Sequence, residues 1–300
     1  MRWYQHRFHS VPTLQLMFRS MERVPRFFHA PLAMATSLFF CCALKRERRA
    51  VAKNLRQITG SRGLSLYWKV YRVFYSFSDS MVSYCYIPQA SHAQLLPMLV
   101  DQEWGAGTID KYLAAGKGVI VWTAHLGNSE FASRLLEIHG RPVNVARVVE
   151  DSPAEKMLRE KMASERLKVV DLKGGAAATL ELLAALRRNE IVAIQGDRVY
   201  NPRHNVELPF FGKSTAFPVG PFLLSQVSGA PVLPGFAIRE GWMRYRMIGG
   251  DPILPDVSGD LETAQRTALI QAVRFLEVQL SVHYDQWMNF FDFWRAKSHD

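Results

Sequence analysis

The feature that most constrains the fold is an alternation, from about residue 118 onward, between short runs rich in β-branched residues and longer stretches with helical periodicity. The predicted strands cover residues 118–125, 142–149, 167–172, 190–197, 231–240 and 242–250. The predicted helices cover residues 129–140, 152–165, 176–189, 220–229 and 259–282. Strands that alternate with helices pair as parallel strands, with the helices packed over the sheet. The pattern therefore predicts an α/β fold with a mixed, mainly parallel central sheet flanked by helices.

The sequence indicates one folded body around this sheet. No internal repeat, low-complexity tract or interdomain linker stands out, and apolar residues make up 48% of the 300 positions, which is enough for a sizeable core. We therefore predict a single α/β domain over residues 61–300, preceded by a helical segment over residues 1–60.

Positive charge is concentrated in the segment 1–60. The whole chain has a net charge of +10, and this segment holds eleven Lys or Arg against Glu22 and Glu47, a net of +9. The rest of the chain is close to neutral. A nucleic-acid-binding domain would carry its positive excess over the folded body, so the distribution argues against nucleic acid as a partner. It indicates instead an anionic membrane surface that is met at one end of the molecule.

An apolar run over residues 27–44 lies inside this basic segment. With eighteen residues it is at the short limit for crossing a bilayer, and Pro31 falls near its start, where a helix tolerates proline. Cationic residues on both sides fit a helix that lies in, or dips into, an anionic membrane surface. We expect a membrane-associating helix, either interfacial or a short anchor. A buried helix of the globular domain and a cleaved signal peptide are less favoured alternatives.

Cysteine is sparse in this chain. Adjacent Cys41 and Cys42 do not easily pair with each other, Cys85 stands apart, and no His lies nearby at a metal-binding spacing. The simplest interpretation is free thiols that face a reducing cytosol.

The most informative polar cluster follows the strand predicted over residues 118–125. His125 stands where that strand ends, Gly127 permits a tight turn, and Glu130 lies in the first turn of the next helix. If the chain turns back on itself here, the Glu130 carboxylate reaches the imidazole of His125. This contact would fix the tautomer of the imidazole and let His125 accept a proton from a hydroxyl. Such a base suits acyl transfer to an alcohol. The alternative is structural, with His125 as a capping residue and Glu130 as an acid favoured by the helix dipole.

Other chemistries lack their sequence signatures. His125 and Glu130 do not have the HExxH spacing of zinc hydrolases, and no G-x-S-x-G marks a nucleophilic serine. The nucleotide-binding patterns G-x-G-x-x-G and G-x-x-x-x-G-K-[ST] do not occur in the sequence. We therefore expect neither a metal ion nor a cofactor.

A second polar cluster ends the strand predicted over residues 190–197. Asp197 and Arg198 stand at the carboxyl end of that strand, so we expect them on the same rim as His125. Arg198 is suited to clamp a phosphate or a carboxylate. An Asp197–Arg198 ion pair that closes the loop is an equally favoured alternative.

A third feature is a loop rich in proline, glycine and aromatic residues. It holds Phe210, Phe211, Gly212, Pro218 and Gly220. A rigid apolar loop of this kind is suited to line an acyl groove. Ordinary packing is the commoner role of an isolated aromatic loop and stays open as the alternative.

Taken together, these elements resemble a known family in their order and spacing. They are AHLGNSE at 124–130, Arg147 after a predicted strand, GDR at 196–198, LPFFG at 208–212, FPVGP at 217–221 and GAPVLP at 229–234. From about residue 45 to 290 the chain resembles the lysophospholipid acyltransferase superfamily and, within it, the lipid A biosynthesis acyltransferase family. The resemblance implies a membrane-associated O-acyltransferase on the cytoplasmic face of the inner membrane.

The resemblance also implies substrates and residue roles. A fatty acyl group would pass from acyl carrier protein or acyl-CoA to a hydroxyl of a lipid A precursor or related glycolipid. His125 would be the general base and Glu130 its orienting acid. The residues implied for substrate binding are Arg147, Asp197, Arg198, Phe210, Phe211, Gly212, Pro218 and Gly220.

The sequence departs from the family pattern at three places. Ser129 replaces a bulky aromatic residue, Arg198 stands where many members have Gln, and the tail over residues 285–294 lacks the usual basic ending. These departures leave the acceptor open, so that a different glycolipid or an amino-acid-linked or polyketide-type lipid is an alternative. A non-catalytic lipid- or carrier-binding protein of the same fold is the alternative from another class.

Overall fold

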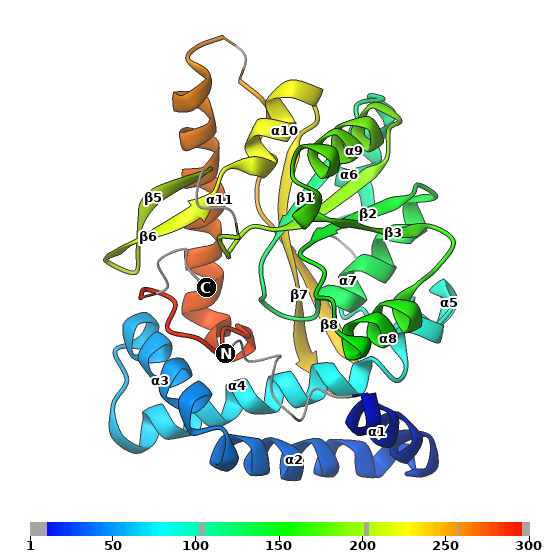
Figure 1. Ribbon diagram of the computed structural model, residues 1–300, viewed down its shortest axis with the longest axis vertical. Coiled ribbons are helices and arrows are strands. Elements are labelled where there is room, and N and C mark those ends of the chain that lie inside the picture. The colour runs from blue at the N-terminus through cyan, green and yellow to red at the C-terminus, as the bar shows by residue number, and fades with distance from the viewer. Residues whose placement is uncertain (1–10, 102–105, 201–203, 257, 296–300) are drawn as a thin grey trace.

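A six-stranded sheet forms the centre of the protein. The computed structural model describes residues 11–101, 106–200, 204–256 and 258–295. The strand order is β3-β2-β4-β1-β7-β8, and all neighbouring strands are parallel except the antiparallel pair β7 and β8 (Figure 1). The strands are β1 Val119–Thr123, β2 Val143–Arg147, β3 Leu167–Asp171, β4 Ile191–Gln195, β7 Val232–Gly241 and β8 Arg244–Gly249. The predicted mixed, mainly parallel sheet is confirmed.

Helices cover both faces of the sheet. On one face lie α9 Ala176–Arg187, α10 Gly220–Ser228 and α11 Leu261–His283. On the other lie α6 Ala106–Ala114 and α7 Ser129–Leu136. Because the central strands β1 and β4 are buried from both sides, their sequences are continuous apolar runs and do not alternate. The same double burial made these strands easy to predict.

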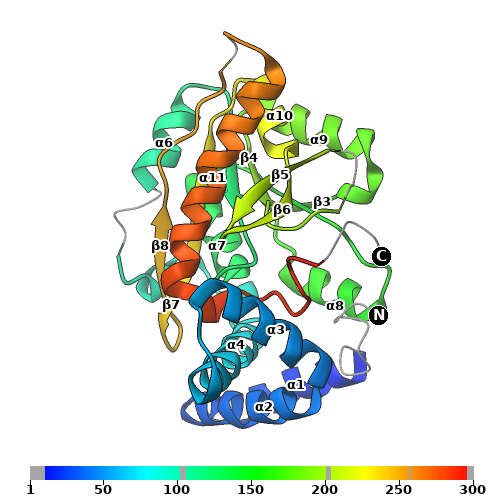
Figure 2. The ribbon, with the colours of Figure 1, turned by 90° about the vertical axis from the view of Figure 1, so that its left-hand side faces the viewer.

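The N-terminal helices gather at one end of the molecule, below the sheet in Figures 1 and 2. They are α1 Val11–Arg23, α2 His29–Ala43, α3 Lys45–Thr59 and α4 Gly63–Ser83. Two further α-helices of the described residues are α5 His92–Leu95 and α8 Pro153–Met162. Residues 1–10 of the predicted segment lie outside the described residues. The predicted division of the chain at residue 60 stays a prediction.

The apolar run of residues 27–44 forms α2. Its buried positions Ala33, Ser37 and Cys41 recur every four residues, and this narrow stripe of small side chains packs against α4. Most of the larger apolar side chains of α2 point outward. Within the residues that the structure describes, no helix combines the length and the apolar character needed to cross a bilayer. Membrane association stays a prediction.

The aromatic loop forms a hairpin of two antiparallel strands, β5 Asn205–Phe210 and β6 Lys213–Pro218. Phe211 and Gly212 make the turn, and both have positive φ, 48° and 76°. Two-residue turns of this kind match the twist of the strands, and glycine adopts the required backbone conformation without strain.

A segment after α11, residues 284–295, runs back beneath the carboxyl edge of the sheet, and we call it the return segment. Its Met288 N–H donates to the carbonyl of His125 at 2.8 Å. Asn54 of α3 donates to the carbonyls of Asn289 and Phe291 at 3.1 and 2.8 Å. The return segment therefore joins the N-terminal helices to the sheet edge.

Candidate active site

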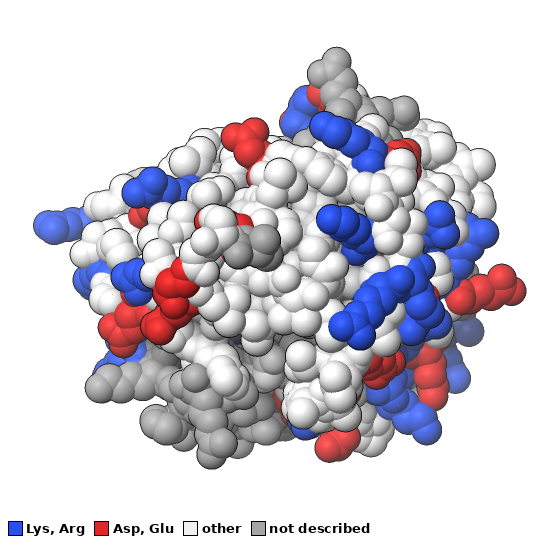
Figure 3. Space-filling model, turned by 90° about the horizontal axis from the view of Figure 1, so that it is seen from above, with Lys and Arg blue, Asp and Glu red and all other residues white. Residues whose placement is uncertain are grey.

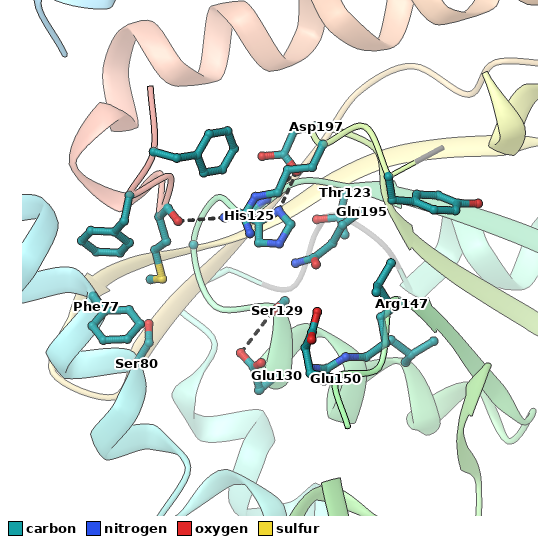
Figure 4. Close-up of a pocket in the computed structure, with 18 of the residues that line it drawn as sticks. Phe77, Ser80, Thr123, His125, Ser129, Glu130, Arg147, Glu150, Gln195 and Asp197 are labelled. Carbon is teal, nitrogen blue, oxygen red and sulfur yellow. Dashed lines mark hydrogen bonds and ion pairs between the residues drawn. The ribbon is translucent and has the colours of Figure 1, made fainter. Parts of the chain in front are cut away.

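The carboxyl ends of the parallel strands open onto a cavity of about 2110 Å³. His125 follows β1 by two residues, Asp197 follows β4 by two residues, and Arg147 is the last residue of β2. All three side chains line the cavity together with Glu130 (Figure 4). Arg198 lines it as well. The expectation that Asp197 and Arg198 share one rim with His125 is confirmed.

His125 pairs with Asp197. Its Nδ1 lies 2.7 Å from Oδ1 of Asp197, and the backbone N–H of His125 donates to the same oxygen at 3.2 Å. Because an ionised carboxylate only accepts hydrogen bonds, Nδ1 carries the proton in the neutral ring. Nε2 then keeps a lone pair, which is what a general base requires.

Two side chains of the return segment hold the Asp197 carboxylate in place. Trp287 donates from Nε1 to Oδ2 of Asp197 at 3.0 Å, and Asn289 donates from Nδ2 at 3.2 Å. Both oxygens of this fully buried carboxylate are thus satisfied. Sequence reasoning missed Trp287 and Asn289, because neither the spacing nor the residue types tie positions 287 and 289 to position 197.

These contacts set the charge states of the pair. Burial alone would raise the pKa of Asp197, but His125, Arg198 and the Trp287 hydrogen bond hold the pKa well below its usual range. Burial lowers the pKa of His125, the Arg198 charge lowers it further, and Asp197 opposes both. At neutral pH the pair is therefore a neutral imidazole beside an ionised carboxylate.

Two glycines make the close approaches behind this pair possible. Gly127 has φ of +76°, and a Cβ there would lie 2.1 Å from the carbonyl oxygen of Ala237. A Cβ on Gly196 would lie 1.9 Å from Nε1 of Trp122. Asn128 begins α7 by accepting the Phe131 N–H at 2.9 Å. The predicted turn at Gly127 and the cap at Asn128 therefore direct the chain from His125 into the helix.

Glu130 does not contact the imidazole through a hydrogen bond. The sequence assigned it the orienting role, whereas its carboxylate accepts from the Tyr84 hydroxyl and, at 3.1 Å, from Ser129 Oγ. Burial and the Glu130 charge raise the pKa of Tyr84, so this phenol stays protonated and donates. The helix after His125 carries Glu130 away from Nδ1, and the carboxylate that occupies this position comes from β4.

The two arginines have structural partners. Arg198 donates from Nε to Asn289 Oδ1 at 2.7 Å and from a terminal nitrogen to the Met288 carbonyl at 2.9 Å. Arg147 pairs with Glu155 of α8. The Asp197–Arg198 ion pair, one of the two alternatives for this cluster, is not formed. Arg198 instead contacts the return segment and acts on Asp197 through its charge.

The hairpin contributes Thr215 and Ala216 of β6 to the cavity lining, but not the residues that the sequence singled out. None of the five loop residues predicted to bind substrate lines the cavity; they are Phe210, Phe211, Gly212, Pro218 and Gly220. Phe210 is fully buried among aromatic rings that include Phe217, Trp287 and Trp294. For Phe210 the structure shows packing in the core, which was the alternative for this loop.

An apolar row on the sheet lines the cavity instead. Val121, Ala193, Val145 and Val169 are paired in register across β1, β4, β2 and β3, and all four line the cavity. We call them the sheet row. Three of these strands carry a polar side chain two residues further along, on the same face of the sheet. These side chains are Thr123, Gln195 and Arg147 (Figure 4). The cavity is therefore apolar beneath the sheet and polar at its edge.

The cavity offers no grouping for a resident metal. In residues 11–101, 106–200, 204–256 and 258–295, no three His, Cys, Asp or Glu side chains gather as metal ligands would. The described side chains place a pair suited to proton transfer, His125 and Asp197, in the same cavity as the apolar sheet row.

Comparison with known proteins gives a consistent family. The family model described as bacterial lipid A biosynthesis acyltransferase matches residues 15–296. A phosphatidylinositol mannoside acyltransferase of Mycobacterium tuberculosis is 30% identical over 207 residues, which is 67% of this chain and 62% of that protein. One of Mycolicibacterium smegmatis is 30% identical over 196 residues, 62% of this chain and 59% of that protein. The chain thus spans somewhat less than two thirds of the length of these relatives.

Proposed function

Because the chain belongs to the bacterial lipid A biosynthesis acyltransferase family, we propose that it transfers a fatty acyl group from an acyl thioester to a hydroxyl of a membrane glycolipid. The observation that carries the proposal is the His125–Asp197 pair on the wall of a cavity with an apolar floor. Such a site suits both substrates, since the base serves the hydroxyl and the apolar floor serves the acyl chain.

In the proposed reaction His125 is the only group that moves a proton. Its Nε2 accepts the proton of the acceptor hydroxyl while that oxygen attacks the thioester carbonyl carbon. Asp197 stabilises the imidazolium through Nδ1–H and does not itself take the proton. The tetrahedral intermediate then breaks its carbon–sulfur bond, and the departing sulfur takes the proton from His125. The products are an ester and a thiol, with the enzyme returned to its starting state.

The sheet row is the proposed floor for the acyl chain. Neighbouring strands lie about 4.8 Å apart, so four paired residues extend roughly 14 Å across the sheet. Leu136 of α7, which packs in one apolar cluster with Val121 and Ala193, also lines the cavity. An extended hydrocarbon chain fits a channel of this length and composition.

The names of the curated relatives favour phosphatidylinositol mannoside as the acceptor class, over the lipid A precursor that the family name suggests. Both are glycolipids that offer a sugar hydroxyl. The proposed donor is a thioester of coenzyme A or of acyl carrier protein, as the sequence resemblance implied.

We place the reaction at a membrane surface, on the strength of an exposed apolar surface at the N-terminal end. Its members are Met34, Leu38 and Phe39 of α2 with Leu64, Tyr67 and Trp68 of α4, and Phe39, Leu64 and Trp68 are 57%, 88% and 62% exposed. Tyr71 of α4 donates to the Met34 carbonyl, which brings the two sets together. Apolar patches with aromatic members of this kind are typical of lipid interfaces.

The test is acyl transfer by the purified full-length chain. Acyl-CoA and acyl carrier protein thioesters are offered with phosphatidylinositol mannoside or a lipid A precursor in detergent micelles, and mass spectrometry follows the acylated lipid. We expect transfer to phosphatidylinositol mannoside and a loss of about 10² or more in the rate for His125→Ala.

A second histidine–carboxylate pair provides the matched control. His139 lies 2.7 Å from Asp110, the same distance as in the His125 pair, and does not line the cavity. His139→Ala should keep the wild-type rate. Equal rates for His125→Ala and the wild type would overturn the proposed base.

A further inference from the structure

The cationic side of α3 lies on the wall of the same cavity. Lys45, Arg49 and Lys53 are spaced four residues apart and form one row along the helix, and Arg46 stands beside them. All four side chains are exposed and line the cavity that holds His125. We call these four residues the α3 row.

The buried side of α3 determines which way the α3 row faces. Val51 and Leu55 are buried against α4, and Asn54 is buried against the return segment. With these positions fixed, the helical repeat leaves the cationic positions on the cavity side. The positive charge near the N-terminus is thus not confined to a surface that faces a membrane.

Two of the four cations of the α3 row, Lys45 and Arg49, have charges that no ion pair neutralises within the part of the chain that the structure describes. Lys53 pairs with Asp292 at 2.8 Å. Lys45 and Arg49 form neither an ion pair nor a side-chain hydrogen bond with any part of the chain that the structure describes. Clustered cations repel one another, so a site of this kind gains most from an anionic ligand.

The α3 row is held at a fixed position relative to the catalytic pair. Asn54 donates to two carbonyls of the return segment and accepts from the Phe293 N–H at 3.0 Å. The same segment sends Trp287 and Asn289 to Asp197. Figure 2 shows α3 lying against this segment. A ligand gripped by the α3 row would therefore be placed relative to His125 with little freedom.

We propose that the α3 row binds a phosphate ester group of a substrate while the reacting carbonyl or hydroxyl lies at His125. Arginine and lysine side chains together suit phosphate, because guanidinium groups bind its oxygens in pairs and ammonium groups add charge. The proposal rests on the proposed function in one respect: it takes acyl thioesters and phospholipids as the compounds that enter. Each carries phosphate, at the carrier end of the donor or in the head group of the acceptor.

The test measures binding without turnover, so that its outcome is separate from that of the proposed reaction. Free coenzyme A is titrated into the full chain by calorimetry at low and moderate salt, and binding to vesicles of phosphatidylcholine with or without phosphatidylinositol is measured by flotation. The cavity variant is Lys45→Gln/Arg49→Gln. The control is Arg56→Gln/Arg62→Gln, which removes two exposed charges nearby that do not line the cavity.

We expect the cavity variant to bind one phosphate probe at least about tenfold more weakly, because a single hydrogen bond to a charged group commonly exceeds a tenfold effect. The control should change the same binding less than about twofold, since screened surface charges contribute little. Thermal unfolding of both variants checks that they are folded.

The two probes identify the source of the phosphate. A loss for coenzyme A alone assigns the α3 row to the donor, and a loss confined to the phosphatidylinositol-dependent part of vesicle binding assigns it to the lipid. Equal losses in the cavity and control variants would show a diffuse electrostatic effect and overturn the proposal. Unchanged binding in both variants would overturn it as well.

Discussion

Glu130 and Asp197 are both candidates for the carboxylate that pairs with His125, and the order of the strands explains why the partner is Asp197. Glu130 is close in sequence, which is why spacing favoured it. Thr123 pairs with Gln195 in the β1–β4 ladder, so the residues two positions beyond each, His125 and Asp197, are neighbours at the sheet edge. The sequence predicted that His125 and Asp197 lie on one rim of the sheet. It could not predict their contact, because the adjacency of β1 and β4 depends on how the whole sheet pairs.

At this scale we predict that Asp197→Asn is more damaging than Glu130→Gln. Asp197→Asn should lower kcat by about 10² or more, because the imidazolium loses the carboxylate paired with it and the ring loses its fixed tautomer. Glu130→Gln should have a smaller effect on kcat, since its carboxylate bonds to Tyr84 and Ser129 instead of the ring.

The pH profile gives a second readout of the same pair. His125 must be neutral to act as a base, so activity falls as pH drops through its pKa. Burial and Arg198 lower that pKa, which puts the acid limb of kcat/KM below the usual histidine value of about 6.5. Asp197 raises the pKa, so Asp197→Asn should move the acid limb to still lower pH. A larger shift in Glu130→Gln than in Asp197→Asn would contradict the assignment.

Among the elements, the strands of the sheet were predicted well and the hairpin was not. Parallel strands buried on both sides are continuous β-branched runs, so β1 and β4 were predicted within two residues of their bounds. Pro209 and the aromatic residues of β5 and β6 instead suggested an irregular loop, which was assigned to the acyl groove. The sequence did not indicate the sheet row. Its four residues come from four strands and cannot be distinguished from ordinary core residues unless the register is known.

For the sheet row we predict that residue size sets the accepted acyl length. Ala193→Leu adds bulk in the middle of the row and should lower kcat/KM for long-chain donors by at least about tenfold while short-chain donors are retained, since overpacking is costly where space is filled. A series of acyl-CoA lengths measures the change. Val169→Ala, at the end of the row, should shift the preference toward longer chains. An equal loss for all lengths in Ala193→Leu would contradict the idea of a channel over the sheet row.

On the scale of the whole molecule, the two ends differ in character. The end formed by α9, α10 and the start of α11 mixes acidic and basic side chains around an uncharged centre (Figure 3). The opposite end holds the exposed apolar surface of α2 and α4 and the α3 row. Net charge predicted that one end differs from the rest. It could not separate the cations that line the cavity from the apolar side chains that face outward, because that separation depends on how α2, α3 and α4 pack.

We predict that this apolar surface holds the protein at a lipid interface. Leu38→Ser/Phe39→Ser should lower partitioning to anionic vesicles by at least about tenfold, because inserting each large apolar side chain is worth more than about 1.4 kcal/mol. Flotation with vesicles measures it. Leu180→Ser/Val227→Ser, two side chains of α9 and α10 that are 65% and 54% exposed, is the control at the far end and should leave partitioning unchanged. Equal effects of the two variants would argue against an oriented interface.

The position of the return segment in the chain has a consequence for biosynthesis. A growing chain that has been synthesised as far as residue 284 already holds α2, α4 and every strand of the sheet. It still lacks Trp287 and Asn289, the two donors that hold Asp197 in place. Because synthesis runs from the N-terminus, the exposed apolar side chains of α2 and α4 are made before the two donors to Asp197. Under the proposed function, the side chains proposed to meet the bilayer are therefore synthesised well before the two donors that complete the proposed base.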